Sequence, residues 1–207
     1  MTVSYPLTIP AALRWASVVD KWSDAVAVSA PAFGGPSRSY DWDASNFIYE
    51  MQVSTQEADA INGAAIRALF RSLRTGFGTF SFGDPVRTTP LGIGTGSPLV
   101  NGALQVGNIL ITDGWTNSQT NILRAGDMLQ LESNLYMNLT DVNSGPTTGP
   151  ATLDIWPSLR KSPADNAAIT VTNPVGVFRI LAPVAFDISP DVFMRGQPFL
   201  LTDVPQV

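Results

Sequence analysis

The feature that most constrains the fold is a series of short apolar segments between residues 99 and 182. NILIT, NILRAGDMLQL, NLYMNLTDV and ATLDIWP alternate apolar and polar side chains or carry continuous apolar runs. A period of two is typical of half-buried strands. The pairs Asp113-Gly114 and Gly126-Asp127 are favoured in the turns between strands. Strands at such close spacing predict a small β-barrel or β-sandwich.

The N-terminal part also predicts strands. NFIYEMQV at 46–53 has apolar side chains at every second position, and FGTFSFGDP at 77–85 places Phe80 and Phe82 on one side of a strand. PAFGGPSRS at 31–39 has the composition of a loop. These patterns therefore predict that the N-terminal part is also β-rich.

A single helix is predicted, over residues 54–75. Ser54 and Glu57 have the spacing of a capping box, and Gly76 stands where a C-terminal cap is favoured. Gly63 costs about 1 kcal/mol relative to Ala inside a helix, which indicates close approach to a neighbouring surface. The expected apolar face comprises Ala58, Ile61, Ala65, Leu69 and Leu73, widened by Ile66 and Phe70.

Three arginines follow one another along this helix, at Arg67, Arg71 and Arg74. Cations near a helix C-terminus complement the negative end of its dipole. We interpret them as residues that stabilise the helix C-terminus and its solvated flank, in preference to a phosphate site.

A stretch rich in Gly, Thr and Pro, residues 86–108, predicts a boundary between two modules. Its GIGTGS segment has glycines at 92, 94 and 96, which does not match the spacing of a dinucleotide-binding loop. No cofactor is therefore expected. The predicted units are residues 1–90 together with 183–207, containing the helix, and an inserted β domain over 95–182.

Composition favours assembly over catalysis. Charged residues are 14% of the 207, against about 25% in an ordinary soluble domain, so much of the surface is expected to be covered by partners. The alternative is a β-rich monomer with an uncharged polar surface. The net charge of −5 and only two lysines, Lys21 and Lys161, give no basic nucleic-acid footprint. The N-terminal MTVSYPLTIP lacks the pattern of a signal peptide, which predicts assembly in the cytoplasm.

The chain contains no cysteine and no histidine. This composition excludes disulfides, Ser-His-Asp and Cys-His catalysis, and the usual ligands of zinc and copper. A mechanism based on carboxylates alone remains open.

Asp127 is the first candidate for such a mechanism, with Glu132, Asp141 or Asp154 as a second carboxylate. Nothing in their spacing requires a pair, and Gly-Asp before a strand is ordinary turn chemistry. We therefore interpret Asp127 as a turn residue and expect Asp127→Asn to disturb folding or assembly only slightly.

Two other kinds of site were considered. A calcium site could draw on oxygen ligands from several acids, but no EF-hand run is present; those acids are Asp113, Asp141, Asp187 and Asp191. Trp115 and Trp156 could stack on sugars, although filling a core or an interface is favoured. No catalytic, cofactor-binding or metal residue is predicted. Trp115, Trp156, Phe80 and Phe82 are the structural or interface candidates.

Several stretches in a fixed order carry a resemblance to a known family. They are SYPLTIP, ALFRSLRTGFGTFSFGDP, TDGW, LRAGDMLQLESNLYMNLTDV, IWPSLRKSPADNAAITVTNP and VGVFRI. Together they resemble tail proteins of tailed bacteriophages and prophages, and are most similar to distal tail proteins. The resemblance spans roughly residues 40–185, and no single motif in it is diagnostic.

This resemblance implies a mainly β fold, with a tail-tube-like β-sandwich, one flanking helix and an inserted small β-barrel or sandwich domain. It implies a structural virion protein, not an enzyme, forming a ring, commonly a hexamer, where the tail tube meets the baseplate. The implied partners are other copies, the tail tube protein, and baseplate hub and fibre proteins. DNA would pass through the lumen without specific binding.

Two other functions stay open. One is a carbohydrate-binding or hydrolysing baseplate module that contacts the host surface, which would need exposed aromatics or a carboxylate pair. The other is a transient assembly factor, which mature particles would lack.

Overall fold

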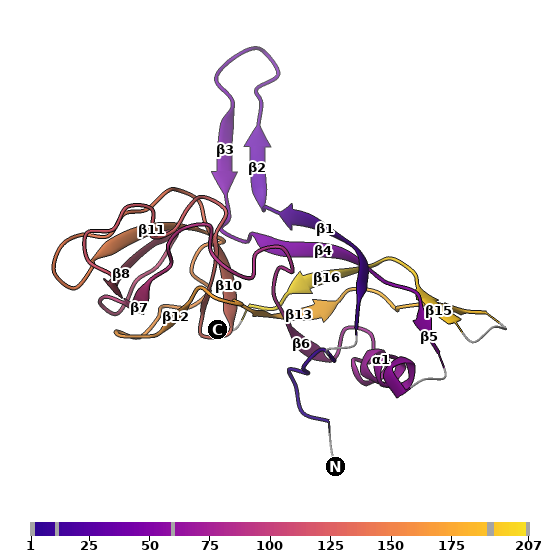
Figure 1. The fold of residues 1–207 in the computed structure, drawn as a ribbon. Coiled ribbons are helices and arrows are strands. Elements are labelled where there is room, and N and C mark those ends of the chain that lie inside the picture. Colours follow the sequence, from indigo (N-terminus) through magenta and orange to yellow (C-terminus); the bar gives the residue numbers. More distant parts are fainter. Residues whose placement is uncertain (1–2, 11–12, 59–60, 190–192, 206–207) are drawn as a thin grey trace. The chain divides into compact units, whose positions relative to one another are not determined.

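The structure is a computed structural model that describes residues 3–10, 13–58, 61–189 and 193–205. Strands make up 41% of the chain and helix 6%, which confirms the predicted mainly β class (Figure 1). The chain divides into two compact units. The first comprises Met1–Trp22, Phe47–Phe82 and Val175–Pro205, and the second contains Ser23–Asn46 and Gly83–Pro174. The expected division placed 1–90 in one unit, whereas Ser23–Asn46 lie in the other.

The first unit is built on a five-stranded sheet. Its order is β1 (Trp15–Ser23), β4 (Asn46–Val53), β16 (Phe199–Asp203), β13 (Gly176–Ile180) and β6 (Thr79–Phe82). Antiparallel pairs join β4 to β16, β16 to β13 and β13 to β6. The chain therefore forms one sheet from segments that lie more than a hundred residues apart.

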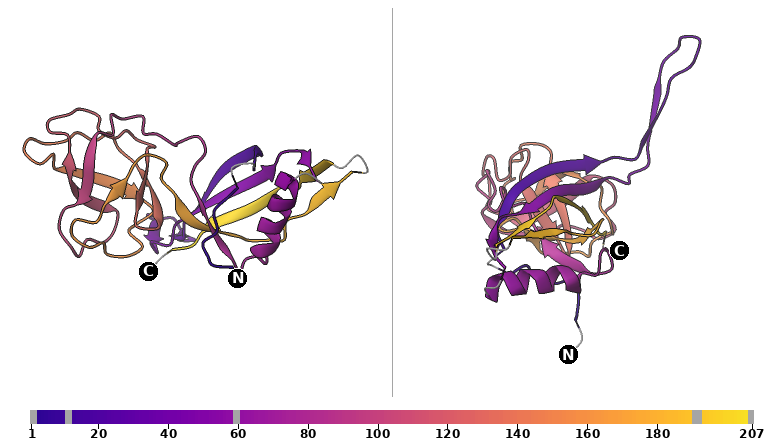
Figure 2. Two further views of the ribbon diagram at one scale, coloured as in Figure 1. Left: turned by 60° about the horizontal axis from the view of Figure 1, so that its bottom comes forward. Right: turned by 90° about the vertical axis from the view of Figure 1, so that its right-hand side faces the viewer.

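One face of this sheet is apolar, as the alternation in 46–53 predicts. Phe47, Tyr49, Met51 and Val53 are buried while the residues between them are half-buried. Cross-strand partners share a face, and Tyr49 pairs with Leu201 in β16. Helix α1 (Ile61–Ser72) covers this face, with the rings of Phe70 and Phe199 5.4 Å apart (Figure 2).

The predicted helix start at Ser54 is wrong. Gln56–Glu57 form a short strand, β5, which pairs with β15 (Phe193–Gly196) instead of capping the helix. A non-local backbone pairing thus prevails over the local capping-box pattern. β14 (Phe186–Ile188) completes a three-stranded sheet in the order β14, β15, β5.

The buried face of α1 comprises Gly63, Ile66 and Leu69, whereas Ile61, expected on that face, is 88% exposed. Gly63 has a clear role. A Cβ atom there would lie 2.0 Å from the backbone oxygen of Glu57, so only glycine lets the helix pass β5 at this distance. The close approach expected from the sequence is therefore confirmed.

The second unit contains a nearly closed, barrel-like sheet of six strands. Its order is β12 (Ile169–Thr170), β9 (Met128–Leu131), β10 (Asn134–Asn138), β11 (Ala151–Trp156), β8 (Ile109–Trp115) and β7 (Gly96–Val100). The last strand returns toward the first, because the Val100 N–H donates to the Ala167 oxygen at 2.9 Å. Its interior is filled by aliphatic side chains with Trp115 and Tyr136.

The predicted turn at Asp113-Gly114 is wrong, because β8 runs through both residues. The pairing of β7 with β8 is irregular between Gly96 and Leu99. Gly96 has φ 117° and pairs with Trp115, and Gly114, the residue before Trp115, has φ 75°; both glycines have a left-handed backbone. Gly114 therefore marks a β-bulge within β8 and not the end of that strand.

The second unit also contains a separate β-hairpin. β2 (Val26–Ser29) pairs antiparallel with β3 (Arg38–Asp41), and every residue of both strands is exposed. In Figure 1 these two strands run side by side, and the structure describes no third strand in their sheet.

Candidate functional site

Asp127, the main candidate for catalysis, is a fully buried structural carboxylate. Its Oδ1 accepts the Leu91 N–H at 2.7 Å, and its Oδ2 accepts the N–H groups of Gly92 at 3.0 Å and Arg124 at 2.8 Å. A side chain with no exposed area and three backbone donors has no room for a substrate. Asp127 thus joins the segment at 91–92 to the turn before β9.

The glycine-rich segment before β7 is therefore part of the barrel unit rather than a free linker. Besides its bonds to Asp127, it donates from Ile93 N–H to Asn121 O and from Gly94 N–H to Ile122 O, both at 2.9 Å. A Cβ at Gly92 would meet the Ile122 oxygen at 2.5 Å. Its glycines allow close backbone packing.

The other acids do not form a catalytic pair with Asp127. Asp141 accepts the Ala125 N–H at 3.0 Å and lies 3.7 Å from an Arg124 nitrogen. Asp154 accepts from the Asn108 amide at 3.1 Å, and Glu132 occupies the exposed turn between β9 and β10 with φ 55°. Each has a local structural role.

The calcium hypothesis gains no support. Asp113 lies in β8 and Asp187 in β14, while Asp191 lies outside the described residues. In the part of the chain that the structure describes, no group of three His, Cys, Asp or Glu residues could hold a metal ion. Nor is any described helix long and apolar enough to cross a membrane.

Three of the four structural or interface candidates lie in the cores of their own units. Phe80 and Phe82 are 3% and 4% exposed, and Trp115 is 2% exposed. Because Trp115 is buried, its ring cannot offer a flat surface to a sugar, and its Nε1–H donates to Thr112 Oγ1 at 2.8 Å. Trp156 is half-buried, and its Nε1–H donates to Asp24 at 3.2 Å.

Three exposed aromatics lie on or beside the β2–β3 hairpin, one of them in the predicted loop at 31–39 and two after it. Phe33 is 101% exposed, Trp42 65% and Tyr40 62%. The rings of Tyr40 and Trp42 form an edge-to-face pair with centroids 4.8 Å apart. The alternation of aromatic and acidic residues in YDWD (40–43) was the available sequence signal.

Apolar side chains occur on both faces of this hairpin. Val26 pairs with Asp41 and Val28 with Ser39, so the two valines lie on one face, whereas Tyr40 pairs with Ala27 and lies on the other. We call Val26, Val28, Phe33, Tyr40 and Trp42 the hairpin surface.

The base of the hairpin is anchored within the second unit. Asp24 accepts from Trp156, Asp43 accepts from the Ser158 hydroxyl at 3.1 Å, and the Arg160 guanidinium donates to the Ser45 backbone oxygen. These contacts hold the root of the hairpin while its strands remain in water.

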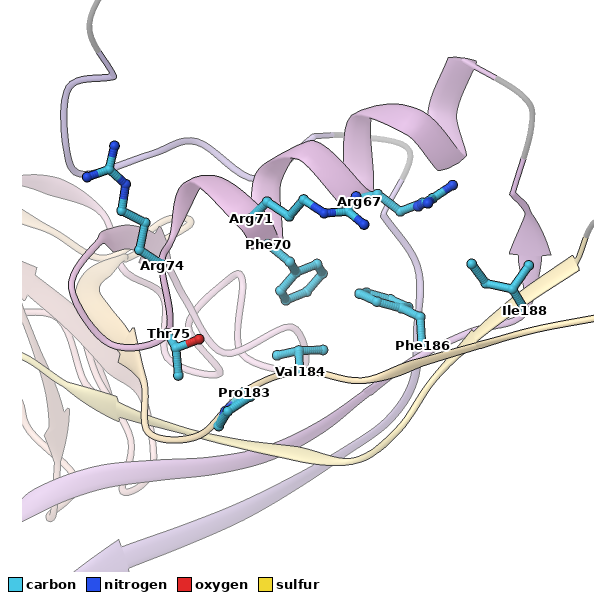
Figure 3. A pocket seen from close by; sticks show the side chains of 9 residues that line it. All are labelled: Arg67, Phe70, Arg71, Arg74, Thr75, Pro183, Val184, Phe186 and Ile188. Carbon is cyan, nitrogen blue, oxygen red and sulfur yellow. The ribbon is translucent and has the colours of Figure 1, made fainter.

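Two of the three arginines, Arg67 and Arg71, lie on α1. The predicted helix end at residue 75 is wrong, because α1 ends at Ser72 and Arg74 follows it with φ 45°. Arg67, Arg71 and Arg74 line a groove of about 440 Å³ with Phe70, Val184 and Phe186 (Figure 3). No family model matches the chain, and no curated protein matches it in sequence. The hairpin surface, the arginine groove and the resemblance described above are therefore the observations that bear on function.

Proposed function

We propose that the chain is a structural virion protein of a phage tail, similar to distal tail proteins, that assembles into a ring where the tail tube meets the baseplate. The observation that carries the proposal is the hairpin surface. It supports self-assembly, while the resemblance to tail proteins supplies the place of that assembly.

An isolated two-stranded hairpin is marginally stable in water. β2 and β3 have only each other as sheet partners among the described residues, and apolar side chains lie on both faces. Burying a large apolar side chain contributes roughly 1.5–3 kcal/mol. Covering Val28, Phe33, Tyr40 and Trp42 would thus supply about 6–12 kcal/mol, comparable to the entropic cost of association.

In the proposed ring, the hairpin of each copy packs on its neighbour, so the contact is repeated around a closed circle. The tail tube protein, baseplate hub and fibre proteins would bind the ring. DNA would pass through the lumen without specific contacts, in keeping with the net charge of −5, since an acidic wall does not hold phosphates.

Light scattering after size exclusion tests the assembly. We expect a species of about six times the 22.1 kDa of the chain. The combined variant Val28→Ser/Phe33→Ser/Trp42→Ser should be monomeric yet folded, with an unchanged circular dichroism spectrum, because these side chains are exposed in the single chain.

The matched control is Leu104→Ser/Val106→Ser, which removes two exposed apolar side chains elsewhere in the second unit, 84% and 74% exposed. It should assemble like the unchanged protein. A monomer at about 100 µM unchanged protein, or equal assembly by the triple variant, would refute the proposed role of the hairpin.

A second candidate, a glycan-binding baseplate module, is favoured by one observation: Tyr40 and Trp42 form an exposed aromatic pair beside Asp41 and Asp43. Exposed aromatics can stack on sugar rings through their apolar faces. Glycan-array binding that is lost in Trp42→Ala, in a protein that stays assembled, would favour this function. Trp115→Ala is not a suitable test because Trp115 is buried.

A further inference from the structure

The groove between α1 and the segment Pro183–Ile188 has an apolar floor and a basic rim. Phe70 from the helix meets Phe186 edge-to-face, with ring centroids 5.3 Å apart, and Val184 and Ile188 extend the floor. Figure 3 shows Arg67 and Arg71 extending from the helix above these side chains, with Arg74 at the end near Thr75. The groove belongs wholly to the first unit.

The arginines have no ionic partner within the described residues. Ion pairs occur elsewhere in the chain, between Lys21 and Glu50 and between Arg124 and Asp141. Arg71 and Arg74 are exposed and Arg67 is half-buried. In a chain of net charge −5, three unpaired cations beside one groove form a local positive field that attracts an acidic ligand.

The groove also borders a free strand edge. β14 is terminal in its sheet, and no further strand pairs with it in the described part of the chain. On the β15 side, Ser189 N–H donates to Phe193 O and Gln197 N–H donates to Ala185 O, both at 2.9 Å.

Backbone groups of an antiparallel strand alternate in direction. Because residues 185 and 189 bond toward β15, the N–H and C=O groups of Phe186 and Ile188 point away from β15, toward the unpaired edge. The side chains of Phe186 and Ile188 line the groove, whereas Asp187 lies on the opposite face of the strand.

We propose that this groove binds an extended acidic segment of another protein, which adds as a strand to the free edge of β14. Main-chain hydrogen bonds to Phe186 and Ile188 hold the segment. Its apolar side chains pack on Phe70 and Phe186, and its carboxylates meet Arg67 and Arg71, whose forked guanidinium groups suit carboxylates. The inference depends on the first unit alone and stands whether or not the chain forms a ring.

The probe is a fluorescein-labelled eight-residue peptide that alternates Val with Glu or Asp, measured by fluorescence anisotropy with the full chain. A peptide with Lys in place of the acids is the charge control. We expect saturable binding of the acidic peptide that weakens as salt rises, and none of the basic peptide.

Two variants test the ionic contacts and the main-chain hydrogen bonds separately. Arg67→Glu/Arg71→Glu should weaken binding at least about tenfold, while Arg14→Glu/Lys161→Glu, with the same change in net charge at exposed positions outside the groove, should bind normally. Ile188→Pro removes one N–H that points away from β15 and should also weaken binding, with little change in thermal unfolding. Ile188→Val keeps that N–H and should bind nearly as well as the unchanged chain.

Three outcomes would overturn the proposal. The first is acidic-peptide binding unaffected by the Arg67→Glu/Arg71→Glu change. The second is binding of a single-stranded oligonucleotide through these arginines in the absence of peptide binding. The third is loss of self-association in Arg67→Glu/Arg71→Glu without peptide, which would make a second copy the occupant.

Discussion

Asp127→Asn should destabilise the second unit by about 2–4 kcal/mol, because it breaks a fully buried set of charge-assisted hydrogen bonds. The carboxylate accepts three backbone N–H groups at 2.7–3.0 Å. An asparagine oxygen in the place of Oδ2 can still accept the N–H groups of Gly92 and Arg124. Its amide nitrogen then faces the Leu91 N–H, so a buried donor loses its acceptor.

The magnitude follows from these contacts. A hydrogen bond to a charged group contributes about 1.5–3 kcal/mol, and a buried unsatisfied donor costs about 1–3 kcal/mol. The small effect expected from a turn residue is therefore revised upward. For a unit of about 120 residues, each kcal/mol corresponds to a shift of about 4 °C, so the midpoint should fall by roughly 8–16 °C.

Differential scanning calorimetry measures this effect. Asp141→Asn is the matched control, because Asp141 accepts one backbone N–H and its side chain is 54% exposed. That variant should lose about 1 kcal/mol or less. Equal midpoints for the two variants would refute the structural role assigned to Asp127.

Three further substitutions test the packing. Gly63→Ala should destabilise the first unit by about 1–3 kcal/mol, because the new Cβ clashes with Glu57 O, although alanine has the better helix propensity. Urea unfolding measures this loss. The control Ala64→Gly changes only helix propensity and should cost about 1 kcal/mol. Phe82→Ala should cost about 3–5 kcal/mol, because its ring centroid lies 5.3 Å from that of Tyr49 and 5.5 Å from that of Phe178; an effect no larger than that of Phe77→Ala, at a ring that is 68% exposed in the same unit, would contradict the core assignment. Thr112→Val should cost about 1–3 kcal/mol by removing the acceptor of the Trp115 indole, whereas the exposed Thr152→Val should be nearly neutral in thermal unfolding.

Local patterns predicted the features that depend on neighbours in sequence. The alternation in 46–53 identified the buried face of β4, because side chains two apart necessarily share a face. The same rule placed Phe80 and Phe82 together. The glycine at 63 indicated a close approach that the position of Glu57 explains.

Contacts between distant segments were not predictable in this way. Gln56–Glu57 belong to a strand because Phe193 and Met194 pair with them, and nothing in the capping-box spacing contains that information. Asp127 binds Leu91 and Gly92, which lie 36 and 35 residues away. The sequence pattern identified the arginines as a cluster on one helix. It did not predict the groove, because Phe186, which lies more than a hundred residues later in the chain, forms the other wall.

The proposed virion role can be tested by electron cryomicroscopy of tail particles purified from bacteria that carry the gene for this chain. We expect a closed ring of copies at the junction of tail tube and baseplate, with the hairpin surface of each copy covered by a neighbour. Particles that lack the chain, or that carry it as isolated copies with Phe33 and Trp42 in solvent, would contradict the proposed ring.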